Sequence, residues 1–154
     1  MTASLIIPGL YVGNAPPLNK DWSLSPVEHL VLAAHELFAE QTSDKFPGVD
    51  VHHVSLEDDP NKPVPAETAA RALEAGAQVA RWLNEGESTA VTCHEGHNRS
   101  GLIAALALVL SKRASPDEAV GLIRAARGPL ALRNPQFLKL LSSLKTPTQL
   151  PTAS

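Results

Sequence analysis

Residues 90–101, AVTCHEGHNRSG, constrain the fold more than any other stretch of the chain. They begin as a short apolar strand, pass through a loop with a central glycine, and enter a long apolar helix that we expect to begin near Gly101. A loop between Cys93 and Arg99 can point both side chains and several backbone N–H groups at one centre. Such a hollow at a helix N-terminus attracts anions, because its N–H groups are unpaired and the helix dipole favours negative charge. We therefore predict an anion site around the single cysteine of the chain.

The same surroundings change the chemistry expected of Cys93. Inward N–H groups, a helix N-terminus and the Arg99 guanidinium all stabilise a thiolate, which makes Cys93 a candidate nucleophile. Arg99 offers a planar fork of donors that fits a tetrahedral oxyanion such as phosphate. These residue types indicate a phosphate ester as the substrate.

The loop resembles the signature of the protein tyrosine phosphatase superfamily, CX5R followed by Ser or Thr. Cys93, Gly96, Arg99 and Ser100 stand in the matching places. The opening I-x-P-G-L-Y-V-G at residues 6–13 is similar to the start of the dual-specificity phosphatases, the compact branch of that superfamily.

A third segment extends the resemblance toward the C-terminus. Residues 133–137 with Leu140 look like the end of dual-specificity domains, where an asparagine, here Asn134, braces the site. The auxiliary basic residue of that pattern falls on Arg127 or Arg133. The resemblance implies one α/β domain with a central, mostly parallel sheet flanked by helices.

The resemblance also implies catalytic roles. Cys93 is the nucleophile and Arg99 binds the phosphate oxygens. Ser100 donates its hydroxyl to the sulfur and stabilises the thiolate as a leaving group. The general acid is an aspartate on a separate loop, and Asp58 and Asp59 lie 35 and 34 positions before Cys93. The family pattern favours Asp58, directly after a strand, while Asp59 remains the alternative and a supporting residue.

The remaining loop residues are expected to contact substrate. With Arg99, the predicted substrate-binding residues are His94, Glu95, Gly96, His97 and Asn98. The C-H-x-x-H spacing resembles a fragment of a zinc site, but three ligands crowd one tight turn without a partner pair downstream. We therefore predict no metal and no cofactor.

One departure from the family pattern precedes the nucleophile. The superfamily usually has a histidine there, and this chain has Thr92. We expect weaker activation of the thiol, with the nucleophile, the arginine and the acid unaffected.

The other histidines carry simpler expectations. His29 and His35 are expected to face solvent or to cap an element rather than to take part in chemistry. His52 and His53 lie on a predicted strand, residues 49–56, and side chains alternate along a strand. They should therefore point to opposite faces and cannot bind one metal together.

The other elements follow from periodicity and turn signals. Apolar runs predict a hairpin over residues 5–14 and a buried parallel strand over residues 29–34. Helices are predicted over residues 66–84, from Ser115 to about Arg127, and from Pro135 to about Leu144. Ser115 and Glu118 form a capping-box pattern.

Composition sets the broad class. A length of 154 residues fits one domain, predicted as residues 1–145 with a disordered tail at 146–154. A net charge of -3 disfavours a nucleic-acid binder. The longest apolar run, residues 102–110, is too short to span a bilayer, and from the first residues we expect no signal peptide. A single free cysteine suits a reducing compartment, so we expect a cytoplasmic protein that does not bind membranes.

Together these features predict a metal-independent phosphatase acting through a phosphocysteine intermediate. Its expected partner is a phosphorylated protein, carrying phosphotyrosine and also phosphoserine or phosphothreonine, or another phosphomonoester. One alternative is a phosphatase for RNA 5′ ends, nucleotides or inositol phosphates. The other is a non-catalytic phosphopeptide-binding module. The sequence does not predict the oligomeric state.

Overall fold

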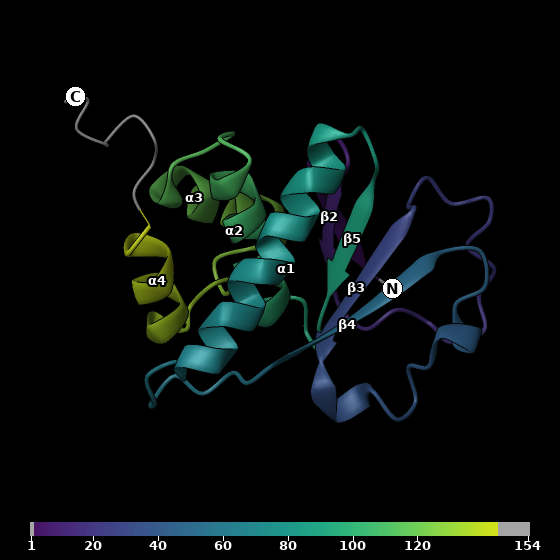
Figure 1. Cartoon of the computed structure of the whole chain (residues 1–154), viewed down its shortest axis with the longest axis horizontal. Coiled ribbons are helices and arrows are strands. Elements are labelled where there is room, and N and C mark those ends of the chain that lie inside the picture. Colours follow the sequence, from purple (N-terminus) through teal and green to yellow (C-terminus); the bar gives the residue numbers. More distant parts are fainter. Residues whose placement is uncertain (1, 145–154) are drawn as a thin grey trace.

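The apolar run at residues 29–34 forms the central strand β3 (His29–Ala34), whose six residues are all buried. In the computed structural model, which describes residues 2–144, β3 pairs in parallel with β4 (Asp50–Leu56) and β5 (Thr89–Thr92). β5 pairs in parallel with β2 (Leu10–Gly13), and β2 pairs antiparallel with β1 (Ala3–Ile7). The strand order β1-β2-β5-β3-β4 confirms the predicted, mostly parallel sheet (Figure 1).

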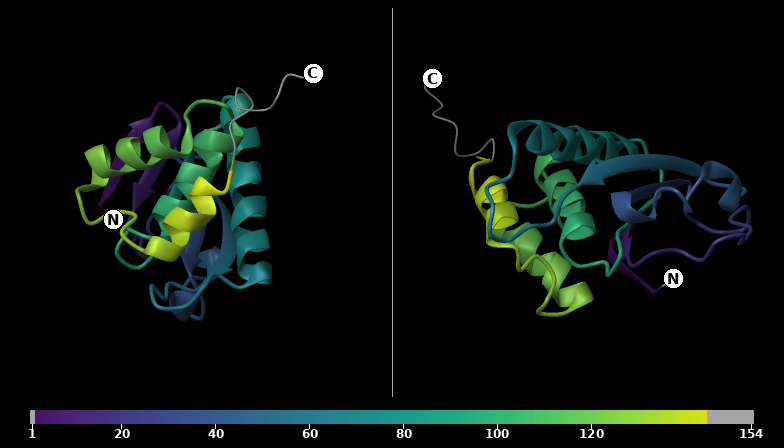
Figure 2. Two further views of the ribbon diagram at one scale, coloured as in Figure 1. Left: turned by 90° about the vertical axis from the view of Figure 1, so that its left-hand side faces the viewer. Right: turned by 90° about the horizontal axis from the view of Figure 1, so that it is seen from below.

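The α-helices of the described chain are α1 (Ala66–Asn84), α2 (Arg99–Leu110), α3 (Pro116–Arg127) and α4 (Pro135–Ser142). All four contribute to one hydrophobic cluster together with Val12, Val31 and Val91 of the sheet. Figures 1 and 2 show the helices gathered to one side of the strands. Because side chains alternate along a strand, the residues on either side of Val12, Val31 and Val91 in the sequence face away from the helices.

The other face of the sheet is covered by segments without α-helix. Leu30, Leu32 and Ala90 pack there against Trp22 and Phe46, in a second and smaller cluster. The chain on this side includes the short 3-10 turn η2 (Ser43–Lys45), and another 3-10 turn, η1 (His35–Leu37), follows β3 at the carboxyl edge of the sheet. The sheet is therefore covered on one face by helices and on the other by loops.

Helix α2 is the centre of the main core, and ten of its twelve residues are buried. It begins at Arg99, two residues before the expected start at Gly101. The first helical bond of this end runs from the Leu102 N–H to the Asn98 carbonyl, 2.8 Å away. The sequence misplaced the start because the first residues of the helix, Arg99 and Ser100, are polar and read as loop. Their place in the first turn aims both side chains at the preceding loop.

The predicted capping box at α3 is confirmed, and the structure adds a cap at α4 that was not predicted. Ser115 accepts from the Glu118 N–H and Glu118 accepts from the Ser115 N–H at the start of α3. Asn134 caps α4 by accepting from the Gln136 N–H at 2.9 Å. The predicted tail at 146–154 lies outside the described residues.

The expectation for His29 is wrong. Its ring is buried, stacks on Trp82 of α1 at 3.8 Å, and bonds to Glu87. The C-terminal turn of α1 covers the start of β3, a long-range contact that local polarity does not reveal. His52 and His53 do point to opposite faces, since His52 lies against Trp82 and His53 bonds to a loop carbonyl. Within the described residues, no helix is both long and apolar enough to cross a membrane.

Candidate active site

Cys93 directly follows β5, at the carboxyl edge of the parallel strands. Its N–H donates to the Gly13 carbonyl of β2 at 3.3 Å, and the residue is only 4% exposed. Its Sγ lies 3.2 Å from the hydroxyl of Ser100 and accepts a bond of the same length from the Gly96 N–H. The predicted nucleophile therefore sits at the base of its loop, with the Ser100 hydroxyl and the Gly96 N–H both in contact with the sulfur.

The carbonyls of residues 94–98 are all bonded to groups outside the loop. Their donors are the Ala15 N–H for His94, the Arg127 guanidinium for Glu95 and Gly96, the Leu132 N–H for His97, and the Leu102 N–H for Asn98. In a planar trans peptide the N–H points opposite to the carbonyl, so the following N–H groups face the side of Cys93 Sγ. Among the described residues, the N–H groups of Glu95, His97, Asn98 and Arg99 have no acceptor. This is the amide-lined hollow that the sequence predicted.

Arg99 is held by an acid that the sequence analysis missed. Its Nη1 and Nη2 donate to the two oxygens of Glu36 at 2.6 and 2.7 Å. The guanidinium holds the pKa of Glu36 at about 2, and the same bond raises the pKa of Arg99. Glu36 follows β3 at the sheet edge that also carries Cys93. The rule that ligand-contacting residues gather beyond the carboxyl ends of parallel strands was a usable signal.

Two side-chain amides bond to Asp58, one from the cysteine loop and one from the start of α4. Asn134 donates to its Oδ1 at 2.6 Å and Asn98 donates to its Oδ2 at 3.2 Å. Asn98 Oδ1 in turn accepts from the N–H groups of Arg133 and Asn134. This network places the predicted acid, the loop and the start of α4 in one rigid unit.

Asp59 has a different environment. Its Oδ1 accepts from the Asn61 N–H at 2.9 Å, an interaction that closes a turn within its own loop. Both aspartates line the pocket, but only Asp58 has bonds to Asn98 and Asn134.

The pocket over Cys93 has a volume of about 510 Å³. The predicted residues on its wall are Asp58, Asp59, Cys93, His94, Glu95, His97, Asn98 and Arg99. His35, Glu36 and Glu57 also line it and were not predicted to. Gly96 and Ser100 lie buried and do not line the pocket, and Asn134 reaches it through Asp58.

The structure shows where Thr92 and the two candidates for the auxiliary basic residue lie. The Thr92 hydroxyl donates to the Val31 carbonyl in β3, so it stabilises the sheet and does not bond to the loop. Arg127 and Arg133, the two candidates for an auxiliary basic residue, are both absent from the pocket wall. Arg127 binds the outer side of the loop instead.

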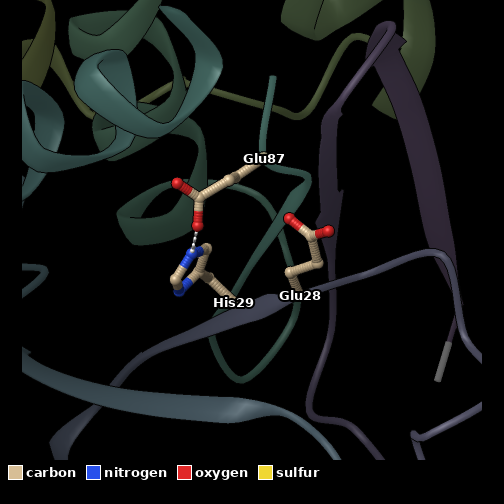
Figure 3. A group of neighbouring side chains, drawn as sticks. All are labelled: Glu28, His29 and Glu87. Atoms are coloured by element: carbon tan, nitrogen blue, oxygen red, sulfur yellow. Dashed lines mark hydrogen bonds and ion pairs between the residues drawn. The ribbon is translucent and has the colours of Figure 1, made fainter. Parts of the chain in front are cut away.

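The described residues bring one group of metal-capable side chains together, Glu28, His29 and Glu87 (Figure 3). It lies at the start of β3, at the opposite end of the strands from Cys93. His29 Nε2 already bonds to Glu87 at 2.8 Å and its Nδ1 lies 3.3 Å from His52 Nε2. These contacts account for both ring nitrogens, so the group acts as a structural network.

Comparisons with known proteins address the fold. No protein-family sequence model and no curated protein sequence matches the chain. Among solved structures, human DUSP28 is 22% identical, with a TM-score of 0.73 over 91% of this chain and 90% of that one. A mouse protein described as a dual-specificity phosphatase, complexed with zinc tungstate, is 23% identical, with a TM-score of 0.73 over 91% and 84%. PTPMT1 in complex with PI(5)P is 24% identical, with a TM-score of 0.70 over 88% and 89%. The expectation drawn from residues 6–13 and the cysteine loop is thus confirmed for the architecture: this chain has the fold of the dual-specificity phosphatases.

Proposed function

We propose that the protein is a cysteine-dependent, metal-independent phosphatase that hydrolyses phosphate monoesters on protein side chains, phosphotyrosine as well as phosphoserine and phosphothreonine. One observation carries the proposal. The sulfur of Cys93 lies at the base of a loop whose free N–H groups face it, beside the guanidinium of Arg99. Free amides and a guanidinium around a thiol form a site for a tetrahedral dianion next to a nucleophile.

The first chemical step forms the phosphocysteine. Cys93 Sγ bonds to phosphorus as the bond from phosphorus to the leaving oxygen breaks, and Asp58 gives its proton to that oxygen. Arg99 and the loop N–H groups hold the other three oxygens, whose charge is spread in the transition state. Asn98 and Asn134 hold the Asp58 carboxyl at the pocket wall during this transfer.

The second step restores the enzyme. A water molecule gives a proton to Asp58 while its oxygen bonds to phosphorus, and the bond between sulfur and phosphorus breaks. The departing thiolate accepts bonds from the Ser100 hydroxyl and the Gly96 N–H, both 3.2 Å from Sγ. These two donors lower the energy of the leaving group.

The charge of the pocket wall favours singly phosphorylated protein residues over polyanions. Five carboxylates line the pocket, those of Glu36, Glu57, Asp58, Asp59 and Glu95. Of the lysine and arginine side chains in the described residues, only that of Arg99 lines it. PTPMT1 was solved with PI(5)P, so inositol phosphates are the alternative to weigh. Additional phosphates of a polyanion would lie against these carboxylates, and like charges repel in a partly desolvated pocket.

Hydrolysis of a generic aryl phosphate in the presence of a chelator tests the reaction. We expect turnover in the wild type and none in Cys93→Ser. Asp58→Asn should lower kcat far more than Asp59→Asn, its matched neighbour, for an aryl phosphate with a poor leaving group. Loss of turnover on chelation, or full turnover in Cys93→Ser, would rule out the proposal.

A second assay separates substrate classes. Initial rates on a phosphotyrosine peptide, a phosphothreonine peptide and a soluble phosphoinositide are compared at equal concentration. We expect kcat/KM for the peptides to exceed that for the phosphoinositide. The reverse order would move the function to the inositol phosphate alternative.

A further inference from the structure

We propose that Arg127 is a positioning residue for the phosphate-binding loop, which sets the direction of loop N–H groups without touching substrate. This inference rests on the proposed function of the same site. Arg127 is the last residue of α3 and its side chain is half-buried behind the loop, on the side away from the pocket.

The guanidinium of Arg127 binds two successive carbonyls of the loop. Its Nε donates to the Gly96 oxygen at 3.1 Å and its Nη2 donates to the Glu95 oxygen at 3.2 Å. Its Nη1 contacts the Thr2 carbonyl at 3.4 Å and the Ser4 hydroxyl at 3.3 Å. One side chain therefore fixes two peptide planes of the loop to the N-terminal strand and to α3.

These two planes are the ones that carry N–H groups to the centre of the site. Holding the Glu95 carbonyl outward turns the Gly96 N–H toward Cys93 Sγ, where it is found at 3.2 Å. Holding the Gly96 carbonyl outward turns the His97 N–H to the same side. The neighbouring carbonyls of His94 and His97 bond to backbone N–H groups, so in the loop itself a side chain holds only these two planes.

The plane next to Gly96 is also the one most able to rotate. Gly96 has a φ of 75°, and glycine populates many backbone conformations at low cost. A Cβ at this position would lie 2.5 Å from Arg127 Nη2, so the contact requires a glycine here. Glycine allows the Arg127 guanidinium to approach the loop closely. The hydrogen bonds from the guanidinium then fix the peptide planes that glycine would leave free to rotate.

The chain contains a matched control for this contact. Arg124, one turn earlier on α3, donates from Nε to the Ala131 carbonyl at 3.0 Å and from Nη2 to the Leu132 carbonyl at 2.8 Å. It is also half-buried and also bridges two successive carbonyls, but these carbonyls lie outside the loop, and their segment meets the loop through one backbone bond, from the Leu132 N–H to the His97 carbonyl. A general loss of packing should therefore appear in both variants.

The test uses inorganic phosphate as the probe and Cys93, the single cysteine of the chain, as the reporter. Protection of the thiol from iodoacetamide is measured against phosphate concentration in the wild type, Arg127→Met, Arg127→Lys and Arg124→Met. We expect the half-protecting concentration to rise about tenfold or more in Arg127→Met, because two charge-assisted hydrogen bonds are lost. Arg127→Lys should recover only part of this, since an ammonium is a point charge without the rigid planar fork that matches two successive carbonyls. Arg124→Met should stay within about twofold of the wild type when thermal unfolding shows a similar loss of stability.

Each outcome of the protection experiment either supports or overturns the positioning role of Arg127. Equal protection curves for the wild type and Arg127→Met overturn the inference, as do equal shifts in the two methionine variants. Full recovery in Arg127→Lys would mean that only the charge matters and would overturn the positioning role. If the wild type is protected by phosphate but hydrolyses no aryl phosphate, the proposed catalysis fails while the inference is still decided by the protection curves. Absence of protection in the wild type overturns both.

Discussion

Replacing Glu36 by glutamine keeps the size of the side chain and removes the charge that pairs with Arg99. The pKa of Glu36 is about 2, against an ordinary value of 4.5, because the Arg99 guanidinium bonds to its carboxylate. At about 1.36 kcal/mol per pKa unit, this difference corresponds to roughly 3 kcal/mol. The Glu36 side chain is 42% exposed, and solvent screens such a pair. We therefore expect Glu36→Gln to lower the free energy of unfolding by about 1 kcal/mol at neutral pH.

The pH dependence of this effect has a definite sign. The pKa of Glu36 is lower in the folded chain than in the unfolded one, so the unfolded chain binds more protons between pH 4.5 and about 2. The stabilisation is present above pH 4.5 and is lost as the pH falls toward 2. Urea unfolding of the wild type and Glu36→Gln should give curves that converge over this range.

The matched control for this prediction is Glu40→Gln. Glu40 is exposed in the same loop and has no ion pair with the described residues. The activity assay is aryl phosphate hydrolysis, in which Glu36→Gln should lower kcat/KM about fivefold, mainly through KM, because the plane of Arg99 is no longer fixed. Equal unfolding free energies for the two glutamine variants at neutral pH would refute the reasoning, and so would a difference that persists unchanged into strong acid.

Three further predictions follow from the geometry around the site and the histidine network. Gly96→Ala should destabilise the fold by more than about 2 kcal/mol and abolish phosphate protection of the thiol. The reason is that a Cβ at Gly96 would lie 2.6 Å from a backbone atom, at a position where φ is 75°. A thermal unfolding midpoint equal to that of the wild type would contradict this. Asn134→Asp should keep the α4 cap, which needs only a side-chain oxygen, yet lower kcat, because a carboxylate would replace the amide that donates to Asp58. An unchanged kcat would show that the Asp58 bond has no role in turnover. The pKa of His52 is lowered from 6.5, mainly by burial, so stability is present above pH 6.5 and is lost as the pH falls and the ring protonates. His52→Gln should therefore flatten the fall in thermal stability between neutral pH and pH 5, and an equally steep profile in the variant would count against this cause.

The sequence predicts those features that depend on residues close to one another in the chain. The apolar run at β3, the capping box at Ser115 and the spacing from Cys93 to Arg99 each act over a few positions, and the structure has the strand, the helix start and the shared hollow. The roles of the site residues stay predictions until the variants are assayed. Their arrangement, however, follows from a strand, a loop and a helix in sequence.

The features that sequence reasoning missed are contacts between distant segments. Glu36 meets Arg99 across 63 positions, and Arg127 meets Gly96 across 31. The burial of His29 depends on Trp82, which α1 brings over the start of β3. No local pattern of polarity encodes such distances, so each of these residues read as an ordinary exposed or auxiliary group.

The donors that hold the cysteine loop come from widely separated parts of the chain, and this gives the protein an order of assembly during translation. Gly13 and Ala15 bond Cys93 and His94, whereas Arg127 and Leu132 bond the later loop carbonyls. When Cys93 has just been added to the growing chain, two of these four partners, Arg127 and Leu132, have not yet been synthesised. On such an incomplete chain the Glu95, Gly96 and His97 carbonyls lack their partners, so the peptide planes of the loop are not yet fixed. The loop around Cys93 can therefore reach its final geometry only after the end of α3 and the segment that follows it have been synthesised.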